Sequence, residues 1–214
     1  MTTTTANSIP EPAAGSLRAV LTGIVIGWFA LVLVAYFAGG FSNAPGEPPL
    51  HFAVSVLVPI AIFLVGFGMI PRFRAAVLAA DLALLTAVQA WRVLGGVFVV
   101  MLAFGHLPGL FAWPAGLGDV AVGLAAPFVA LATLRRPQSV TKRSFAVFHW
   151  LGILDLVIAV GTGVASSGML PALTGSVTTA PMSMMPLVLI PGFLVPLFVI
   201  LHLTALLKVR HLKH

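Results

Sequence analysis

Cysteine is absent from the 214-residue sequence. Its absence excludes disulfide bonds, thiolate catalysis, iron–sulfur clusters held by cysteine and cysteine-ligated zinc. Charge is also scarce, because Asp, Glu, Lys and Arg together make up 7% of the residues, whereas a typical soluble domain has about 25%. Hydrophobic residues make up 60%, so the chain has too few polar side chains to cover a water-soluble surface. The composition therefore predicts a protein whose solvent is the lipid bilayer.

The sequence also lacks the familiar enzyme motifs. It contains no HExxH zinc motif, no GxSxG nucleophile elbow, no Walker loop and no dinucleotide-binding GxGxxG. The GLGD stretch at residues 116–119 is too short for a phosphate-binding loop, and its glycines are more simply explained by close helix packing. The sequence therefore does not indicate an enzyme, and we predict neither catalytic residues nor a metal site.

Long apolar runs predict the fold. A helix needs about 20 residues to cross about 30 Å of hydrocarbon, and alternation typical of membrane β-strands is missing. Six runs are long enough: 17–38, 52–70, 75–104, 114–134, 145–166 and 184–207. We therefore predict an all-α transmembrane bundle of six helices, in which the long third run must tilt, bend at Gly95 and Gly96, or project from the membrane.

The six runs define a single domain, which we place at residues 17–208. Residues 1–16 are rich in Thr, Pro and Ala without an apolar period, so we predict a disordered N-terminal tail. Residues 209–214 form a basic C-terminal tail. Three prolines spaced five residues apart, Pro186, Pro191 and Pro196, predict a kinked or broken sixth helix at mid-depth. In transporters the carbonyls freed by such a break bind ions or substrate, although prolines also occur there for packing alone.

Basic residues are confined to alternate connections. They lie at the start of the first run, between runs two and three, between runs four and five, and after run six: Arg18, Arg72, Arg74, Arg135, Arg136, Lys142, Arg143, Lys208, Arg210 and Lys213. This pattern predicts a multi-pass protein of the inner (plasma) membrane with both termini in the cytoplasm. It also explains the net charge of +6 through topology and contact with anionic lipid, so we predict no nucleic-acid partner.

Apart from Arg18 at the start of the first run, four charged residues lie inside the predicted spans, namely Asp81, Arg92, Asp119 and Asp155. A charge at that depth costs at least about 2.5 kcal/mol, so these residues should face the bundle interior. At 1.5 Å per residue, Arg92 and Asp119 reach a similar depth in the outer half, and we expect them to pair. Asp155 lies near the midplane with no cation at its depth. We therefore expect a neutral carboxyl there, which is able to carry a proton.

These residues support two interpretations. The first is a site that binds or conducts a small polar solute or ion. Its predicted members are Arg92, Asp119, Asp155, Asp81, Gln89 and Trp113. The second is an internal ion pair that only fixes helix packing, with a neutral Asp155 hydrogen-bonded to the backbone or to Gln89.

Histidines offer a rival chemistry. His149 and His202 lie at similar depths near the cytoplasmic ends of runs five and six, a spacing that suits two axial ligands of a b-type haem. With His51 and His106 as an outer pair, the layout resembles that of diheme membrane cytochromes. The resemblance would imply electron transfer. Histidines capped by backbone or lipid headgroups are the alternative.

Four stretches give the chain a wider resemblance: WRVLGGVF, FAWPAGLGDV, LGILDLVIAV and LIPGFLVPLFVILHL. In these the chain resembles a group of small bacterial six-helix inner-membrane proteins over roughly residues 75–205, a likeness that implies a fold but no activity.

Our main prediction is a transporter or channel for a small polar solute or ion, with proton coupling through Asp155. The alternatives are the haem protein and a non-catalytic subunit of an oligomer or larger membrane complex, with Gly23 and Gly27 as a packing motif.

Overall fold

The computed structural model describes residues 11–42, 47–170, 172 and 175–213, with side chains described from residue 19 onward. These residues form helices and turns, and no strand occurs among them. Six helical stretches are long and apolar enough to cross a membrane: Ala19–Phe37, Leu50–Met69, Leu82–Ala103, Gly109–Arg135, Arg143–Ala165 and Ile190–Leu212. The predicted all-α bundle of six spans is confirmed.

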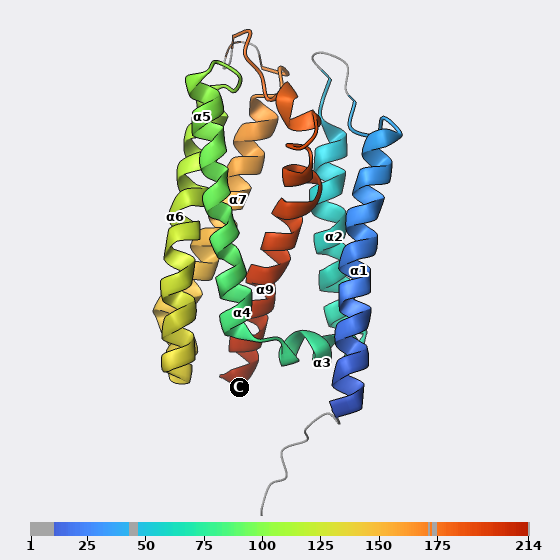
Figure 1. Ribbon diagram of the computed structural model, residues 1–214, viewed down its shortest axis with the longest axis vertical. Coiled ribbons are helices and arrows are strands. Elements are labelled where there is room, and N and C mark those ends of the chain that lie inside the picture. The colour runs from blue at the N-terminus through green and yellow to red at the C-terminus, as the bar shows by residue number, and fades with distance from the viewer. Residues whose placement is uncertain (1–10, 43–46, 171, 173–174, 214) are drawn as a thin grey trace, which may run out of the picture.

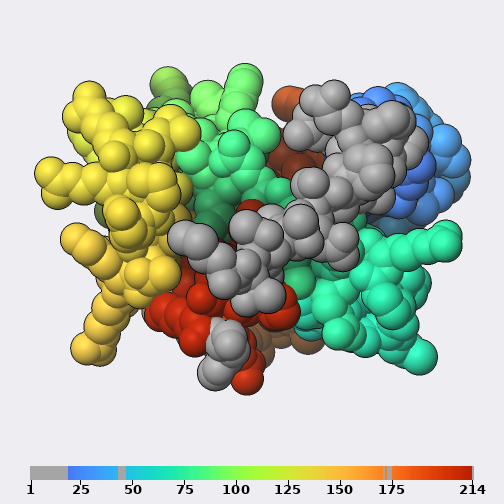
Figure 2. Space-filling view, turned by 90° about the horizontal axis from the view of Figure 1, so that it is seen from below, coloured from blue at the N-terminus to red at the C-terminus, as the bar shows by residue number. Residues whose placement is uncertain are grey.

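The helices stand side by side in an elongated bundle (Figure 1). The pair α1 (Glu11–Phe37) and α2 (Leu50–Met69) lies on one side, α6 (Gly109–Arg135) lies on the other, and α9 (Val195–Leu212) stands between them. The start of α1 and the end of α9 lie at the same end of the bundle (Figure 1). The connections rich in Lys and Arg lie there too, so we call it the basic end. Figure 2 looks onto it and shows α3, the connection from α6 to α7 and the end of α9 around the face.

The third span begins later than predicted. Residues 71–79 form a separate short helix, α3 (Pro71–Ala79), which runs across the basic end (Figure 1). The membrane helix then starts as α4 (Leu82–Val88), tightens into the 3-10 segment η1 (Gln89–Gly96) and continues as α5 (Val97–Ala103). Asp81 causes the break, because its exposed carboxylate caps α4 by accepting the Ala83 and Leu84 amides at 2.8 and 3.1 Å. The prediction of one helix from residue 75 is therefore wrong.

The sixth span is irregular at its prolines, as predicted. The irregular turn does not lie at mid-depth, however, so that part of the prediction is wrong. Pro186 precedes the span, while Pro191 lies in a π-helical turn, η4 (Ile190–Leu194), that leads into α9. A proline cannot donate a backbone hydrogen bond, and π turns are a usual place for such defects. The irregular turn lies in the half of the bundle opposite the basic end.

The remaining elements complete the chain. The segment η2 (Pro137–Thr141) joins α6 to α7 (Arg143–Ala165), and η3 (Ala180–Ser183) lies in the last connection opposite the basic end. Helix α1 starts at Glu11, inside the predicted tail, while residues 1–10 lie outside the described part. At the other end α9 continues to Leu212, into the predicted basic tail.

Glycines on α6 bring it close to the third span. A Cβ atom at Gly123 would overlap the backbone of Val93, and one at Gly116 would come within 2.7 Å of the Val99 side chain. Small residues permit this close approach in membrane helices. The contact places the middle of α6 directly against η1.

Candidate functional site

Arg92 is the centre of a buried polar cluster. Its side chain has no exposed surface, and its Nε donates to Asp119 Oδ1 at 2.7 Å. Its Nη2 donates to Asp155 Oδ2, and its Nη1 donates to the Gly152 carbonyl at 3.0 Å. The two carboxylate side chains are each 13% exposed. One guanidinium from η1 thus holds a carboxylate from α6 and another from α7.

Two glycines make room for the cluster. A Cβ at Gly118 on α6 would overlap the carboxylate of Asp155 on α7, and a Cβ at Gly152 on α7 would overlap the imidazole of His202 on α9. Any other residue at either position would force the neighbouring helix or side chain to shift. The small residues of the sequence therefore position polar groups as well as helices.

A chain of hydrogen bonds leads from Arg92 toward the basic end. Arg92 Nη1 lies 3.3 Å from His202 Nε2, and the Nδ1 atoms of His202 and His149 are 2.8 Å apart. His149 Nε2 lies 3.4 Å from Thr86 Oγ1, and the Thr86 hydroxyl donates to the Leu82 carbonyl at 2.7 Å. His149, His202 and Thr86 are fully buried. Leu82 is the first residue of α4, next to the exposed Asp81.

The partners at the two ends of this chain fix the protons within it. Arginine only donates, so His202 Nε2 accepts and His202 Nδ1 carries the hydrogen. That hydrogen is donated to His149 Nδ1, which leaves the hydrogen of His149 on Nε2. The Thr86 hydroxyl gives its only hydrogen to Leu82 and so accepts from His149 Nε2. Both ends require the same tautomers, and both imidazoles are neutral.

The cluster therefore has an excess of negative charge when both carboxylates are ionised. Asp119 and Asp155 carry two negative charges, Arg92 carries one positive charge, and the histidines contribute none. An unbalanced charge in a low-dielectric interior is costly. One proton or one cation restores neutrality.

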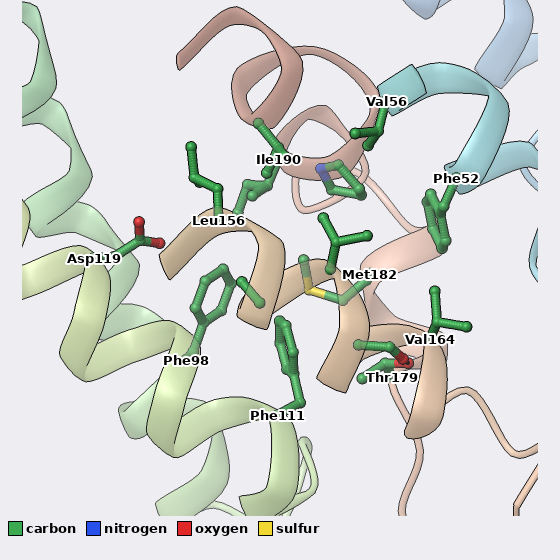
Figure 3. Close-up of a pocket in the computed structure, with 15 residues that line it drawn as sticks. Phe52, Val56, Phe98, Phe111, Asp119, Leu156, Val164, Thr179, Met182 and Ile190 are labelled. Carbon is green, nitrogen blue, oxygen red and sulfur yellow. The ribbon is translucent and has the colours of Figure 1, made fainter. Parts of the chain in front are cut away.

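A cavity opens beside Asp119 of the cluster (Figure 3), and the residues that line it lie in the half of the bundle opposite the basic end. Its empty volume, including the open mouth, is about 570 Å³. Among the described residues that line it, only Asp119 and Thr179 have polar side chains, and Thr179 donates its hydroxyl to the Gly163 carbonyl at 2.9 Å. Figure 3 shows Asp119 at one edge, with Phe98, Phe111 and Met182 among the apolar side chains that fill the rest of the wall. Asp119 is thus the charged contact that the cavity offers.

The structure brings together some of the predicted site residues and separates others. Arg92 and Asp119 pair as expected. Asp155 also pairs with Arg92, so the expectation that it has no cation is wrong. Asp81 caps α4 at the basic end and lies outside the cluster. Trp113 is 52% exposed on α6 and does not line the cavity.

Gln89 is fully buried, one helical turn before Arg92, and neither atom of its amide finds a hydrogen-bond partner among the described residues. The predicted bond to Asp155 is therefore not formed. Sequence reasoning missed Thr86 altogether. The available signal was its spacing, since Thr86, Gln89 and Arg92 recur every three residues and so share one face of the third span.

The predicted haem ligands bind one another instead. The rings of His149 and His202 have centroids 5.0 Å apart at an interplanar angle of 76°, and their Nδ1 atoms are joined by a hydrogen bond. A haem needs its macrocycle between the two axial nitrogens, and this arrangement leaves no space for one. Of the predicted outer pair, His51 packs against Phe41 and Phe52 and His106 is exposed. The histidines do not fit a haem as they are arranged here.

These features define a class of protein, namely a multi-pass membrane protein whose helix bundle encloses a buried cluster of charged side chains. Residues 47–210 match a family described as a domain of unknown function (DUF8737), and the chain belongs to that family. The match covers every residue of the cluster and leaves α1 outside. No curated protein and no solved structure matches the chain.

Proposed function

We propose that the protein transports a small solute or ion across the inner membrane, with Asp119 as its charged contact. One observation carries the proposal: Asp119 belongs both to the cavity wall and to the Arg92 cluster. From that cluster, hydrogen bonds continue to Leu82 near the basic end. Polar groups thus connect the two halves of an otherwise apolar bundle.

Arg92 has a supporting role in this proposal. Its side chain is completely buried and its nitrogens already donate to Asp119, Asp155, His202 and Gly152. Among the described residues that line the cavity, no side-chain donor is free to bind a solute. This differs from the expectation that guanidinium and carboxylate bind the solute together. Arg92 instead stabilises two carboxylates at a depth where neither is stable alone.

The irregular start of the sixth span also supports transport. Ile190 and Pro191 of η4 line the cavity, and the Pro191 carbonyl lies 3.5 Å from the Ser55 hydroxyl of α2. Such turns have fewer internal hydrogen bonds to break when a helix bends. A change at η4 would open or close the cavity.

The test is flux in liposomes that contain the purified protein and a pH-sensitive dye, with a panel of small solutes added outside. We expect a solute-dependent flux that Asp119→Asn abolishes. The matched control is Asp81→Asn, because it makes the same change outside the cluster and asparagine also caps helices well. Equal flux in the wild type and in Asp119→Asn would contradict the proposal.

The haem alternative has a direct test of its own. An absorption spectrum of the purified protein, before and after dithionite, shows whether haem is bound. Because the two imidazoles bind each other, we expect no haem band. A band that disappears in His202→Ala would replace transport by electron transfer as the proposed function.

A further inference from the structure

We propose that the transported substrate is a small, mainly apolar cation and that it exchanges with one proton at the Arg92 cluster. The inference rests on the proposed transport function and specifies its substrate class. Two observations support this proposal, namely the side chains that line the cavity and the net charge of the cluster.

The side chains that line the cavity favour binding of an apolar solute with one positive charge. Phe52, Phe98 and Phe111 present aromatic rings to the cavity, and such rings bind organic cations through their faces as well as through apolar contact. The hydroxyl of Thr179 is already committed to a backbone carbonyl, so a solute with several polar groups finds few partners. An anion would meet Asp119 without access to the buried Arg92.

The charge of the cluster supplies the exchange. Four elements contribute charged or titratable groups to the cluster: η1 contributes Arg92, α6 contributes Asp119, α7 contributes Asp155 and His149, and α9 contributes His202. The cavity-lining residues of α2, α5, η3 and η4 are not titratable, and His51 on α2 packs between Phe41 and Phe52. Because the histidines are neutral, the two ionised carboxylates carry one negative charge that Arg92 does not balance.

The exchange step is balanced. Without a cation, one of the two carboxyl groups holds a proton. When the cation enters, the O–H bond breaks, the proton passes to water, and the ionised carboxylate of Asp119 pairs with the cation. The charge of the site is the same before and after. No oxidation or reduction takes part.

The experiment is isothermal titration of the full-length protein in detergent with benzyltrimethylammonium, whose charge does not depend on pH. We expect binding with about one proton released per cation, measured from heats in buffers of different ionisation enthalpy. Affinity should rise up to about tenfold per pH unit while the cluster is protonated. Phenylacetate and phenylacetamide serve as anionic and neutral probes of similar size. We expect each to bind at least about tenfold more weakly than the cation.

Two variants distinguish the contact between Asp119 and the cation from the net charge of the cluster. Asp119→Asn should abolish both cation binding and proton release. Asp155→Asn keeps Asp119 on the cavity wall but leaves one carboxylate for one guanidinium, so proton release should disappear and affinity should fall at least about tenfold. Asp81→Asn should bind as the wild type does. An unchanged affinity in a folded Asp155→Asn protein would overturn the charge argument.

The outcomes distinguish this inference from the proposed function. Binding without proton release, or equal binding of the three probes, would overturn proton exchange with a cation. Flux of another solute in a protein that does not bind the cation would overturn the substrate class and leave transport standing. Cation binding with proton release but no flux in liposomes would leave the site standing and overturn transport.

Discussion

His149 and His202 illustrate how much one buried side chain depends on the next. Each imidazole is fully buried and uses both of its nitrogens, one toward its partner and the other toward Thr86 or Arg92. Removing one ring leaves polar groups of its neighbours unpaired in an apolar interior, which costs about 1–3 kcal/mol for each group. The pair therefore acts as a unit.

Because the two histidines act as a unit, we expect their substitutions to have non-additive effects on the free energy of unfolding. His149→Leu and His202→Leu should each lower the free energy of unfolding by more than about 1 kcal/mol. The double variant should lose less than the sum of the two, by at least about 0.5 kcal/mol, because no histidine is left with an unpaired nitrogen. Denaturant unfolding in detergent measures all three, with the exposed His106→Ala as control. Strict additivity would show that the hydrogen bond between the rings contributes little.

Asp155 shows why the site was only partly predictable from the sequence. The predicted fourth span began at residue 114, whereas α6 begins at Gly109. The five additional residues place Asp119 about 7.5 Å deeper than expected. The third span begins at Leu82 and not at residue 75, which places Arg92 about 10 Å closer to the basic end, at the depth of both Asp119 and Asp155. The depth of a residue depends on where its helix begins, and helix ends are the least certain part of a prediction.

At the scale of the element, helix α6 meets its neighbours through glycine. A glycine in a helix interior usually costs about 1 kcal/mol relative to alanine, and a close contact with a neighbouring helix can offset this cost. Gly118 has one, since the Asp155 carboxylate occupies the place of its missing side chain. Gly161 on α7 has no atom near its missing Cβ.

These two glycines predict opposite effects of the same substitution. Gly118→Ala should destabilise the protein by about 1–3 kcal/mol, because Asp155 must move away from Arg92 to make room. Gly161→Ala should be neutral or stabilising by up to about 1 kcal/mol. Thermal unfolding in detergent compares them directly. A Gly118→Ala protein as stable as the wild type would mean that Asp155 can move at no cost.

The element boundaries also show what the sequence reveals and what it does not. Apolar runs predicted all six spans, because length and composition alone decide whether a helix can cross a bilayer. The break at Asp81 was missed although its signals were present, namely Pro71 at a helix start and an aspartate suited to cap the next helix. The matching depths of His149 and His202 were read from the sequence, but the rotation of each helix about its axis comes from packing, so their direct hydrogen bond was not predicted.

At the scale of the whole molecule, the two ends of the bundle differ in charge. Arg72, Arg74, Arg135 and Lys208 lie toward one end, and the connections at the other contain neither Lys nor Arg. The start of α1 and the end of α9 lie at the same end of the bundle, which agrees with an even number of spans (Figure 1). The positive-inside rule predicts that the basic end faces the cytoplasm.

The natural absence of cysteine makes this orientation simple to test. We expect a membrane-impermeant maleimide to label His106→Cys on intact cells, because this exposed residue lies opposite the basic end. Gln138→Cys, exposed in η2 at the basic end, should react only after the cells are opened. Labelling in the reverse order would invert the predicted topology.

The chain of hydrogen bonds from Arg92 to Leu82 has one further consequence. Every donor in it points the same way, so its bond dipoles add to a local dipole with the positive end toward the basic end. In the predicted orientation, the inside-negative voltage of a living cell stabilises this alignment. The alignment is also fixed at both ends, because the Arg92 guanidinium can only donate and the Leu82 carbonyl can only accept. The interior of the bundle is therefore electrically asymmetric even where it carries no net charge.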